Sequence, residues 1–424
     1  MRFDYLTWFF RKFNAFVLAV FVLLIPFSRL KQPLHYDADH SADKTNYPFV
    51  FVHGFQGWNE DAKGYQGMQY WGMFNGDALR GYREAGYTCV APMIDPVGSV
   101  WDRTCELYAK LKGTRVDYGK AHSEACGHDR YGEDYTGKAL IPTWDGAHKV
   151  NLIGHSLGGN NCILLASLLA FGAEAEQAAT TDGTLSELFT GGKGDWVHSV
   201  TGLAAVYNGT SLFVNHQAVR DTERYVKERL AEQKLILPLT RALIGKSIDG
   251  VSDLLADISS GTVAAPDTAI YDMQPEHAAE LNKQIGTAES VYYFSEVQDA
   301  TMPSKLDGHL VADPDVSDPI IGLLVPIIAR TNTVAADGTP LDETWQANDG
   351  CANVVSQRAP FGAPTAELDE APSAALAAKA QRGVYNIFPT VRATHMWPIG
   401  DFMKPNPDGL VYVLHLMEMI NALN

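Results

Sequence analysis

The most reactive pattern in the chain is the pentapeptide GHSLG at residues 154–158, which places Ser156 between two glycines. Residues 149–153 before it are predicted to form a strand, and residues 161–171 after it a helix without charge. A strand, Gly-x-Ser-x-Gly and a helix in this order make a tight turn that exposes the serine hydroxyl above a sheet. Ser156 is therefore predicted to be a nucleophile for acyl transfer, with His155 as a packed neighbour.

A serine that attacks a carbonyl carbon also needs N–H donors for the negative charge that develops on the carbonyl oxygen. One predicted donor is the backbone N–H of Leu157, at the first turn of the helix that follows the serine. The second is expected from the loop after an early strand. The tripeptide HGF at residues 53–55 lies there, so the backbone N–H of Phe55 is the predicted second donor.

The serine hydroxyl needs a base, and the base needs a carboxylate that orients it. In proteins with this turn the order along the chain is serine, acid, histidine. His395 follows a late strand-like segment and is the predicted base; His309 is its rival but precedes the best acid. That acid is Asp349, in the turn sequence NDG, and Asp342 is its rival.

Several strands and helices must position these residues. Strand-like runs occupy residues 47–53, 87–94, 149–153, 200–207, 291–294 and 383–387, and helices are expected at residues 77–85 and 161–171. Strands that alternate with helices predict an α/β fold with a mostly parallel sheet covered by helices on both faces. Two stretches interrupt the alternation. Residues 216–262 indicate an inserted helical section rich in leucine, and residues 362–382 a surface excursion rich in Ala, Pro and Glu.

Composition and charge exclude several classes of function. Hydrophobic residues make up 46% and charged residues 20%, which is typical of a globular protein. The formal net charge of −17 repels phosphate backbones and anionic headgroups, so no nucleic-acid partner is expected. Five widely spaced cysteines do not form a disulfide scaffold, although export would permit a bond between Cys105 and Cys126.

The N-terminus indicates export. Residues 15–27 are an unbroken apolar run preceded by Arg11 and Lys12, which is typical of a secretory signal. Residues 1–31 are therefore interpreted as a signal peptide or an uncleaved signal anchor, and the polar residues 32–46 as a linker. The protein is expected to be secreted, or extracellular and tethered to the membrane by residues 1–31.

Taken together, these motifs resemble the zinc-containing true lipases of Gram-positive bacteria, over about residues 47–400. The resemblance rests on residues 53–58 and 70–72 as an oxyanion segment, residues 348–350 as an acid motif, and residues 394–395 as a base motif. It implies an α/β-hydrolase fold over residues 47–424, with catalysis by Ser156, Asp349 and His395. It also implies that residues 216–262 act as a lid.

The resemblance also implies one structural zinc ion. Asp102, His122, His128 and Asp267 fall on the family's ligand positions, and two imidazoles with two carboxylates can close a tetrahedral site. Cys126 lies between the two histidines, and Asp272 is expected to cap a helix. A calcium ion is doubtful, because Trp397 stands where the family has a glutamate, although Asp401 could supply one oxygen.

The function that these expectations favour is a serine lipase that hydrolyses carboxylic esters of glycerolipids at a lipid–water interface. A carboxylesterase or phospholipase with the same triad is the alternative among enzymes. A catalytically silent binding protein with this fold is the alternative from another class, but such proteins usually lack a member of the triad. Here Ser156, Asp349 and His395 are all present.

Overall fold

The computed structural model describes residues 34, 45–59, 69–214, 265–316, 321–401 and 406–424. The predicted signal or anchor segment, residues 1–31, and the predicted lid, residues 216–262, lie outside the described residues, as does most of the linker at 32–46. Among the described residues, every helix is too short or too polar to span a membrane.

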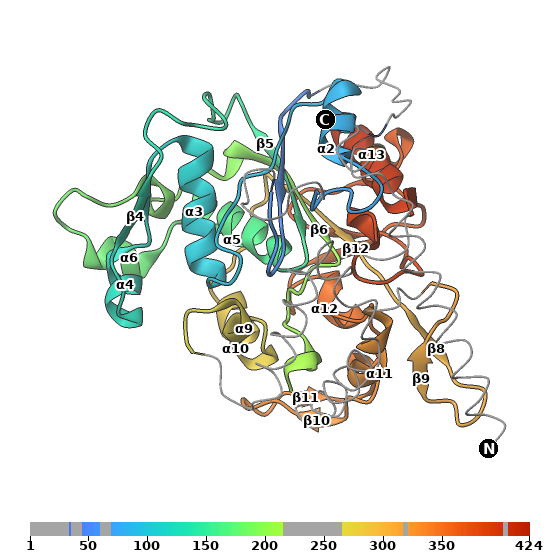
Figure 1. Ribbon diagram of the computed structural model, residues 1–424. Coiled ribbons are helices and arrows are strands. Elements are labelled where there is room, and N and C mark those ends of the chain that lie inside the picture. Colours follow the sequence, from blue (N-terminus) through green and yellow to red (C-terminus); the bar gives the residue numbers. More distant parts are fainter. Residues whose placement is uncertain (1–33, 35–44, 60–68, 215–264, 317–320, 402–405) are drawn as a thin grey trace, which may run out of the picture.

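A seven-stranded sheet forms the centre of the molecule (Figure 1), and all its strands run parallel. In spatial order the strands are β12 (Thr365–Glu367), β13 (Tyr385–Ile387), β7 (Tyr292–Glu296), β6 (Val197–Leu203), β5 (Val150–His155), β1 (Phe49–Val52) and β2 (Cys89–Val90). The strand-like runs predicted from the sequence all contribute to this sheet, which confirms the α/β fold.

Helices cover both faces of the sheet. On one face lie α3 (Val100–Lys112) and α5 (Leu157–Phe171), and on the other lie α2 (Ala78–Glu84) and α13 (Asp408–Asn421) (Figure 1). The reason is visible in β1, whose four residues are all buried and point alternately to the two faces. Val50 and Val52 belong to the core with α5, whereas Phe49 and Phe51 belong to the core with α13. A parallel sheet buried on both faces needs such a continuous apolar strand.

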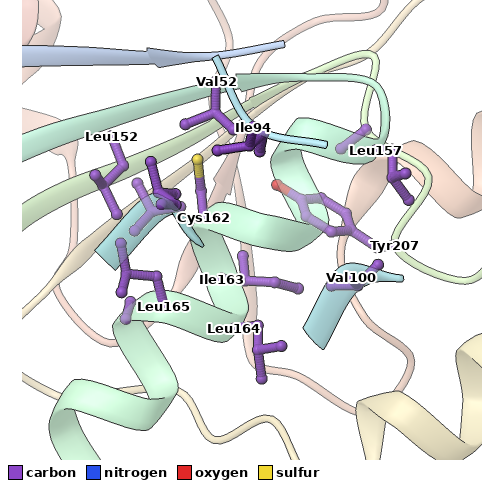
Figure 2. Close-up of a cluster of buried hydrophobic side chains, with 14 of the residues drawn as sticks. Val52, Ile94, Val100, Leu152, Leu157, Cys162, Ile163, Leu164, Leu165 and Tyr207 are labelled. Atoms are coloured by element: carbon purple, nitrogen blue, oxygen red, sulfur yellow. The ribbon is translucent and has the colours of Figure 1, made fainter. Parts of the chain in front are cut away.

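Helix α5 is the most completely buried helix among the described residues. Residues 157–169 are all buried, because α5 lies between the sheet and α3. Figure 2 shows Cys162 and Leu165 of this helix beside Val52 and Leu152 of the sheet. This position explains why the helix carries no charge. The helix begins at Leu157, four residues earlier than the sequence pattern predicts.

The remaining elements extend from this core. The helices are α4 (Lys120–Cys126), α6 (Glu174–Ala179), α9 (Ala269–Asp272), α10 (Pro275–Asn282), α11 (Val325–Ile328) and α12 (Val354–Arg358). The strands form three small antiparallel sheets: β3 (Arg115–Asp117) with β4 (Tyr131–Asp134), β8 (Thr301–Pro303) with β9 (Leu310–Ala312), and β10 (Thr333–Val334) with β11 (Pro340–Leu341). Short 3-10 helices include η8 (Ala374–Lys379) and η9 (Trp397–Ile399).

The prediction of a surface excursion at residues 362–382 is wrong in part. Within it, Thr365–Glu367 form β12, the edge strand that pairs with β13. Leu376 of η8 is buried in the core that contains α13. An edge strand has one neighbour and a solvated side, so it keeps polar residues and lacks the apolar run that identifies a central strand.

Candidate active site and metal cluster

Ser156 lies at the carboxyl end of β5, in the sharp turn into α5. Its backbone has φ 55° and ψ −129°, a left-handed conformation that a non-glycine residue rarely adopts. The turn fits only because its neighbours are small: a Cβ atom on Gly158 would lie 2.2 Å from the carbonyl oxygen of Val52. The strain and the close approach are those of a nucleophile elbow, the turn predicted for Ser156.

The two predicted oxyanion donors lie beside this turn. Leu157 is the first residue of α5, and the N–H groups of a first helical turn have no partner within the helix. In the loop after β1, the N–H of Gly54 donates to the Tyr70 hydroxyl at 2.9 Å, and that of Gln56 donates to the Pro96 carbonyl at 2.7 Å. Among the described residues the N–H of Phe55, between them, has no recorded acceptor. Phe55 stays the predicted second oxyanion donor.

Asp349 and His395 form a buried pair. The Nδ1 atom of His395 lies 2.7 Å from Oδ2 of Asp349, and the backbone N–H of His395 donates to the Asp349 carbonyl at 3.0 Å. Oδ1 of Asp349 accepts the N–H groups of Cys351 and Ala352 at 2.8 and 2.7 Å, and Gln357 donates to Oδ2 at 3.2 Å. The carboxylate is thus oriented from several directions, and it fixes the proton of His395 on Nδ1. The lone pair on Nε2 is left free to act as a base.

The rival residues lie in other surroundings. The N–H of His309 donates to Asp307, in the turn between β8 and β9. Asp342 caps the 3-10 helix Glu343–Trp345 at the surface, where it accepts from Thr344. Neither side chain has a recorded contact with Ser156 or His395. The catalytic roles of Ser156, Asp349 and His395 stay predictions, but their geometry is that of a base oriented by a carboxylate.

His155, predicted as a packed neighbour, is buried and makes two specific contacts. Its Nδ1 lies 2.6 Å from the Tyr70 hydroxyl, and its Nε2 lies 2.8 Å from the backbone carbonyl oxygen of His395. Burial, with His395 nearby, holds the pKa of His155 well below its usual range, so this imidazole stays neutral. Sequence reasoning placed Tyr70 in the oxyanion segment but did not foresee these contacts.

Arg103 is a second residue that sequence reasoning missed. This fully buried side chain donates to the carbonyl oxygens of His53 and Asp95, both at 2.6 Å, and to Oδ1 of Asn161 at 3.0 Å. It therefore fixes the start of the loop that carries Phe55. The sequence could have indicated this role, because Arg103 directly follows Asp102 and falls on the buried side of a helix.

Glu296 is the third residue that sequence reasoning missed. It is the last residue of β7 and lies close to Asp349, the predicted triad acid. Its Oε2 atom accepts the N–H of Ala204 at 3.1 Å and the side-chain amide of Gln298 at 3.0 Å, and the carboxyl is fully buried. Burial, aided by the nearby charge of Asp349, raises the pKa of Glu296 to about 8 despite these donors. At neutral pH it is therefore a protonated acid beside an ionisable one. The sequence feature that could have identified Glu296 is a carboxyl group at the end of an apolar strand.

The four predicted metal ligands come together at the side of the molecule that carries α4 (Figure 1). Nε2 of His122 lies 3.0 Å from Oδ1 of Asp102 and 3.2 Å from Oδ1 of Asp267. Nε2 of His128 lies 3.3 Å from Oδ2 of Asp267 and 3.9 Å from Oδ2 of Asp102. Ligand atoms around a tetrahedral zinc ion lie about 3.3 Å apart, given metal–ligand distances of about 2.0 Å.

The hydrogen bonds of this cluster also fit a cation. Among the described residues, Nε2 of both histidines and one Oδ1 atom of each aspartate are buried without a well-directed hydrogen bond. Nδ1 of His128 donates to the carbonyl oxygen of Asp129 at 2.9 Å, which leaves the Nε2 lone pair free for a metal. Burial lowers the pKa of His122, but the two carboxylates beside it raise the pKa to about 9 in the absence of a metal.

Cys126 is a rival ligand. One donor atom from each of Cys126, His122, His128 and Asp267 can be chosen so that all lie within 4.8 Å of one another. The sulfur, however, lies 3.8 Å from Nδ1 of His122, whereas Nε2 of that ring faces the carboxylates. The set with Asp102 therefore fits one ion better. Cys105 is buried, Cys126 is exposed, and neither forms a disulfide.

Asp272 has the role of a helix cap, as predicted. Its Oδ2 accepts the N–H of Val100, the first residue of α3, at 2.6 Å. Asp401, the one oxygen donor considered for calcium, is buried and accepts from the Thr394 hydroxyl at 3.4 Å. The expectation that calcium is doubtful stays a prediction.

Known proteins resemble this chain over most of its length. Residues 45–409 match the family model described as "Lipase-like, C-terminal domain". The chain is similar to a lipase of Staphylococcus hyicus, with 31% identity over 369 residues, which are 85% of this chain and 54% of that protein. The chain thus spans about half the length of the staphylococcal relatives it matches.

Two solved structures are similar over nearly their whole length. EstA from Clostridium botulinum superposes with a TM-score of 0.71 at 28% identity, covering 92% of each chain. Lipase 1 from Pelosinus fermentans superposes with a TM-score of 0.69 at 28% identity, covering 90% of this chain and 100% of that one. These similarities confirm the fold class that the sequence predicts.

Proposed function

Because the chain belongs to the family of lipase-like C-terminal domains, we propose that it is a serine lipase that hydrolyses carboxylic esters of glycerolipids. The single observation that carries this proposal is the buried pair of Asp349 and His395, which share two hydrogen bonds in a protein whose Ser156 occupies a strained elbow. The relatives named as lipases support the substrate class.

In the proposed mechanism Nε2 of His395 takes the proton of the Ser156 hydroxyl as the oxygen attacks the ester carbonyl carbon. Asp349 holds the Nδ1 proton and stabilises the imidazolium that forms. The N–H groups of Phe55 and Leu157 bind the oxyanion, and losing one such donor typically costs ~10²–10³ in rate. His395 then protonates the leaving alcohol. Water attacks the acyl-enzyme with His395 as base, and the fatty acid and Ser156 are released.

We further propose that Asp102, His122, His128 and Asp267 hold one structural zinc ion. Such an ion would supply no chemistry to the ester; it would fasten α3, α4 and the segment before α9 to one another. The distances and the buried atoms without hydrogen bonds support this assignment. Elemental analysis of the purified protein, which should give one zinc per chain, tests the identity of the metal.

We also propose that the protein is exported, and either released or tethered by residues 1–31. The apolar run at 15–27 with basic residues before it supports this location. N-terminal sequencing of protein recovered from the medium and from membranes distinguishes a cleaved signal from a retained anchor. Recovery of the intact chain in the cytosol alone would contradict export.

The experiment that tests the enzyme is hydrolysis of nitrophenyl esters and emulsified triglyceride by the full chain and by Ser156→Ala. We expect turnover of long-chain esters that rises when substrate forms droplets and disappears in the variant. Turnover of short soluble esters alone would favour the carboxylesterase alternative, and turnover of phospholipid vesicles alone the phospholipase. Full activity in Ser156→Ala would overturn the assignment of Ser156 as the nucleophile. If the full chain hydrolysed no ester, the remaining alternative would be a catalytically silent binding protein with this fold.

A further inference from the structure

A continuous series of buried hydrogen bonds passes beside Ser156 and joins the two loops that flank it. The N–H of Gly54 donates to the Tyr70 hydroxyl at 2.9 Å, that hydroxyl lies 2.6 Å from Nδ1 of His155, and Nε2 of His155 lies 2.8 Å from the backbone oxygen of His395. Tyr70 and His155 are 4% and 1% exposed, so water does not compete for these bonds.

The donors and acceptors in this series fit only one direction. The backbone carbonyl of His395 can only accept, so Nε2 of His155 carries the proton and donates it. Nδ1 of His155 is then an acceptor, and the Tyr70 hydroxyl donates to it while its oxygen accepts from Gly54. The low pKa of buried His155 keeps the ring neutral and preserves this tautomer. No member of the series is left with an unused buried donor.

Three members of the series belong to, or directly precede, residues of the proposed mechanism. Gly54 precedes Phe55, which supplies an oxyanion donor; His155 precedes Ser156; and the final acceptor belongs to His395 itself. The contact is also close, since a Cβ atom on Gly54 would lie 2.8 Å from Cβ of Ser156. Small shifts of either loop therefore change the distances between donor, nucleophile and base.

We propose that Tyr70 and His155 are positioning residues that hold the oxyanion loop and the loop of the catalytic histidine at fixed distances from Ser156. This inference rests on the proposed ester hydrolysis and deepens it. It gives the variable residue of the GHSLG motif a defined role: His155 connects the nucleophile turn to the backbone of the base.

A packing role is the competing explanation. The Tyr70 ring makes edge contacts with Trp58 and Trp71, with ring centroids 5.3 Å apart in both cases. Tyr70→Phe keeps the ring and these contacts and removes only the hydroxyl. If Tyr70 acts through packing alone, this variant should retain the rate of the unmodified protein. If the hydroxyl positions the loops, the rate should fall.

The matched control is Tyr82→Phe. Tyr82 is also buried, at 1% exposure, and its hydroxyl donates to the Leu410 carbonyl at 2.8 Å on the face of the sheet that α2 and α13 cover. Both variants lose one buried tyrosine hydroxyl, so both should lower the melting temperature, and Tyr70→Phe should lower it more because that hydroxyl has two hydrogen-bond partners and the Tyr82 hydroxyl donates to one. Only Tyr70→Phe should change the chemistry.

The measurements are kcat, KM and melting temperature of the full chain with a short soluble nitrophenyl ester. Active sites are counted with a phosphonate ester that phosphonylates Ser156. We expect Tyr70→Phe to lower kcat about 10- to 100-fold per titrated site with little change in KM, because misplaced reacting groups slow the chemical step. Tyr82→Phe should keep kcat within about twofold of the unmodified protein, since its hydroxyl lies outside the series.

A second variant keeps the inference testable if Tyr70→Phe does not fold. His155→Gln retains an amide that can donate to His395, whereas His155→Phe keeps a ring without donors. We expect kcat to decrease in the order unmodified, His155→Gln, His155→Phe. Equal kcat for all three would overturn the inference. So would a Tyr70→Phe variant no slower than Tyr82→Phe.

Failure of the inference can be told apart from failure of the proposed function. If the unmodified chain hydrolyses the ester and Ser156→Ala does not, the function holds, and the tyrosine and histidine variants then judge the positioning role alone. If the unmodified chain hydrolyses no ester and does not react with the phosphonate, the proposed function fails and the positioning role fails with it.

Discussion

The proposed catalytic centre and the proposed metal cluster both join carboxylates to imidazoles, yet they are built in opposite ways. At the catalytic centre Asp349 is fully buried and receives donors on both of its oxygens. At the metal cluster buried nitrogen and oxygen atoms face one another at 3.0–3.9 Å without well-directed hydrogen bonds. The first arrangement is complete through its own protons, whereas the second would be completed by the proposed cation. The first should therefore determine rate, and the second stability.

The largest effect expected from this contrast is at the triad acid. Asp349→Asn keeps the shape and the acceptor oxygen but offers His395 the wrong hydrogen-bonding partner, so kcat should fall by ~10⁴. The melting temperature should change little, because the backbone donors of Cys351 and Ala352 keep an acceptor. Steady-state kinetics beside a thermal melt check both. A loss below tenfold would show that another carboxyl orients the base, and Glu296 would be the first to test.

The second effect concerns the metal cluster. Asp267→Asn, or removal of the metal by a chelator, should destabilise the folded protein by about 3–4 kcal/mol if the metal is present at 100- to 1,000-fold its dissociation constant. The initial rate at low temperature should fall far less than in Asp349→Asn. Melting curves with and without chelator measure the effect, and Asp313→Asn, which loses an ion pair with Arg392, is a control for carboxylate removal elsewhere.

A melting temperature that is unchanged by chelation would contradict a structural metal. So would a chelator effect of equal size in Asp267→Asn and in the unmodified protein, since the variant should already have lost the ion. A loss of rate that precedes any loss of structure would mean that the metal acts on the catalytic centre, and the division of roles between the two regions would fail.

The smallest effect concerns Glu296 and pH. An unfolded chain releases this proton near pH 4.5, but burial raises the pKa to about 8 in the folded protein. Between these values the folded state keeps a proton that the unfolded state has released, so stability is lost as the pH rises, by up to about 1.4 kcal/mol per unit. Glu296→Gln should remove this dependence.

Urea unfolding at pH 5 and pH 7 measures this pH dependence of stability. The free energy of unfolding of Glu296→Gln, relative to the unmodified protein, should increase by on the order of 2 kcal/mol between the two pH values. If the two proteins differed in free energy of unfolding by the same amount at both pH values, Glu296 would be ionised in the folded state. In that case two negative carboxylates would lie together next to the proposed base.

The sequence predicts the centre of this molecule better than its periphery, for physical reasons. A central parallel strand must be apolar on both faces, and β1 and β5 therefore stand out in the sequence. β12 does not, because an edge strand tolerates the polar residues Thr365 and Glu367. The apolar run at 200–207 also misplaced the end of β6. Ala204 takes φ 47° and leaves the strand, while the buried chain continues.

The same reasoning separates the site residues. Ser156 is recognisable because its turn needs local glycines and a helix that follows at once. The contacts of Tyr70, Arg103 and Glu296 join residues 85, 50 and 92 positions apart, and no local pattern encodes such pairings. The proposed metal ligands were predicted by resemblance to a family, since the pair of histidines six positions apart is not specific by itself.

Helix α13 has a consequence for how the chain reaches this structure. It supplies much of the core behind β1, and Asn421 accepts hydrogen bonds from Thr45, 376 positions earlier. A β1 strand made early during synthesis therefore keeps Phe49 and Phe51 uncovered until α13 has been made. Contacts of such long sequence separation slow folding and prolong the exposure of apolar strands. The nascent chain should thus depend on chaperones for longest at β1, the strand that leads into the loop of Phe55 and pairs with β5 beside Ser156.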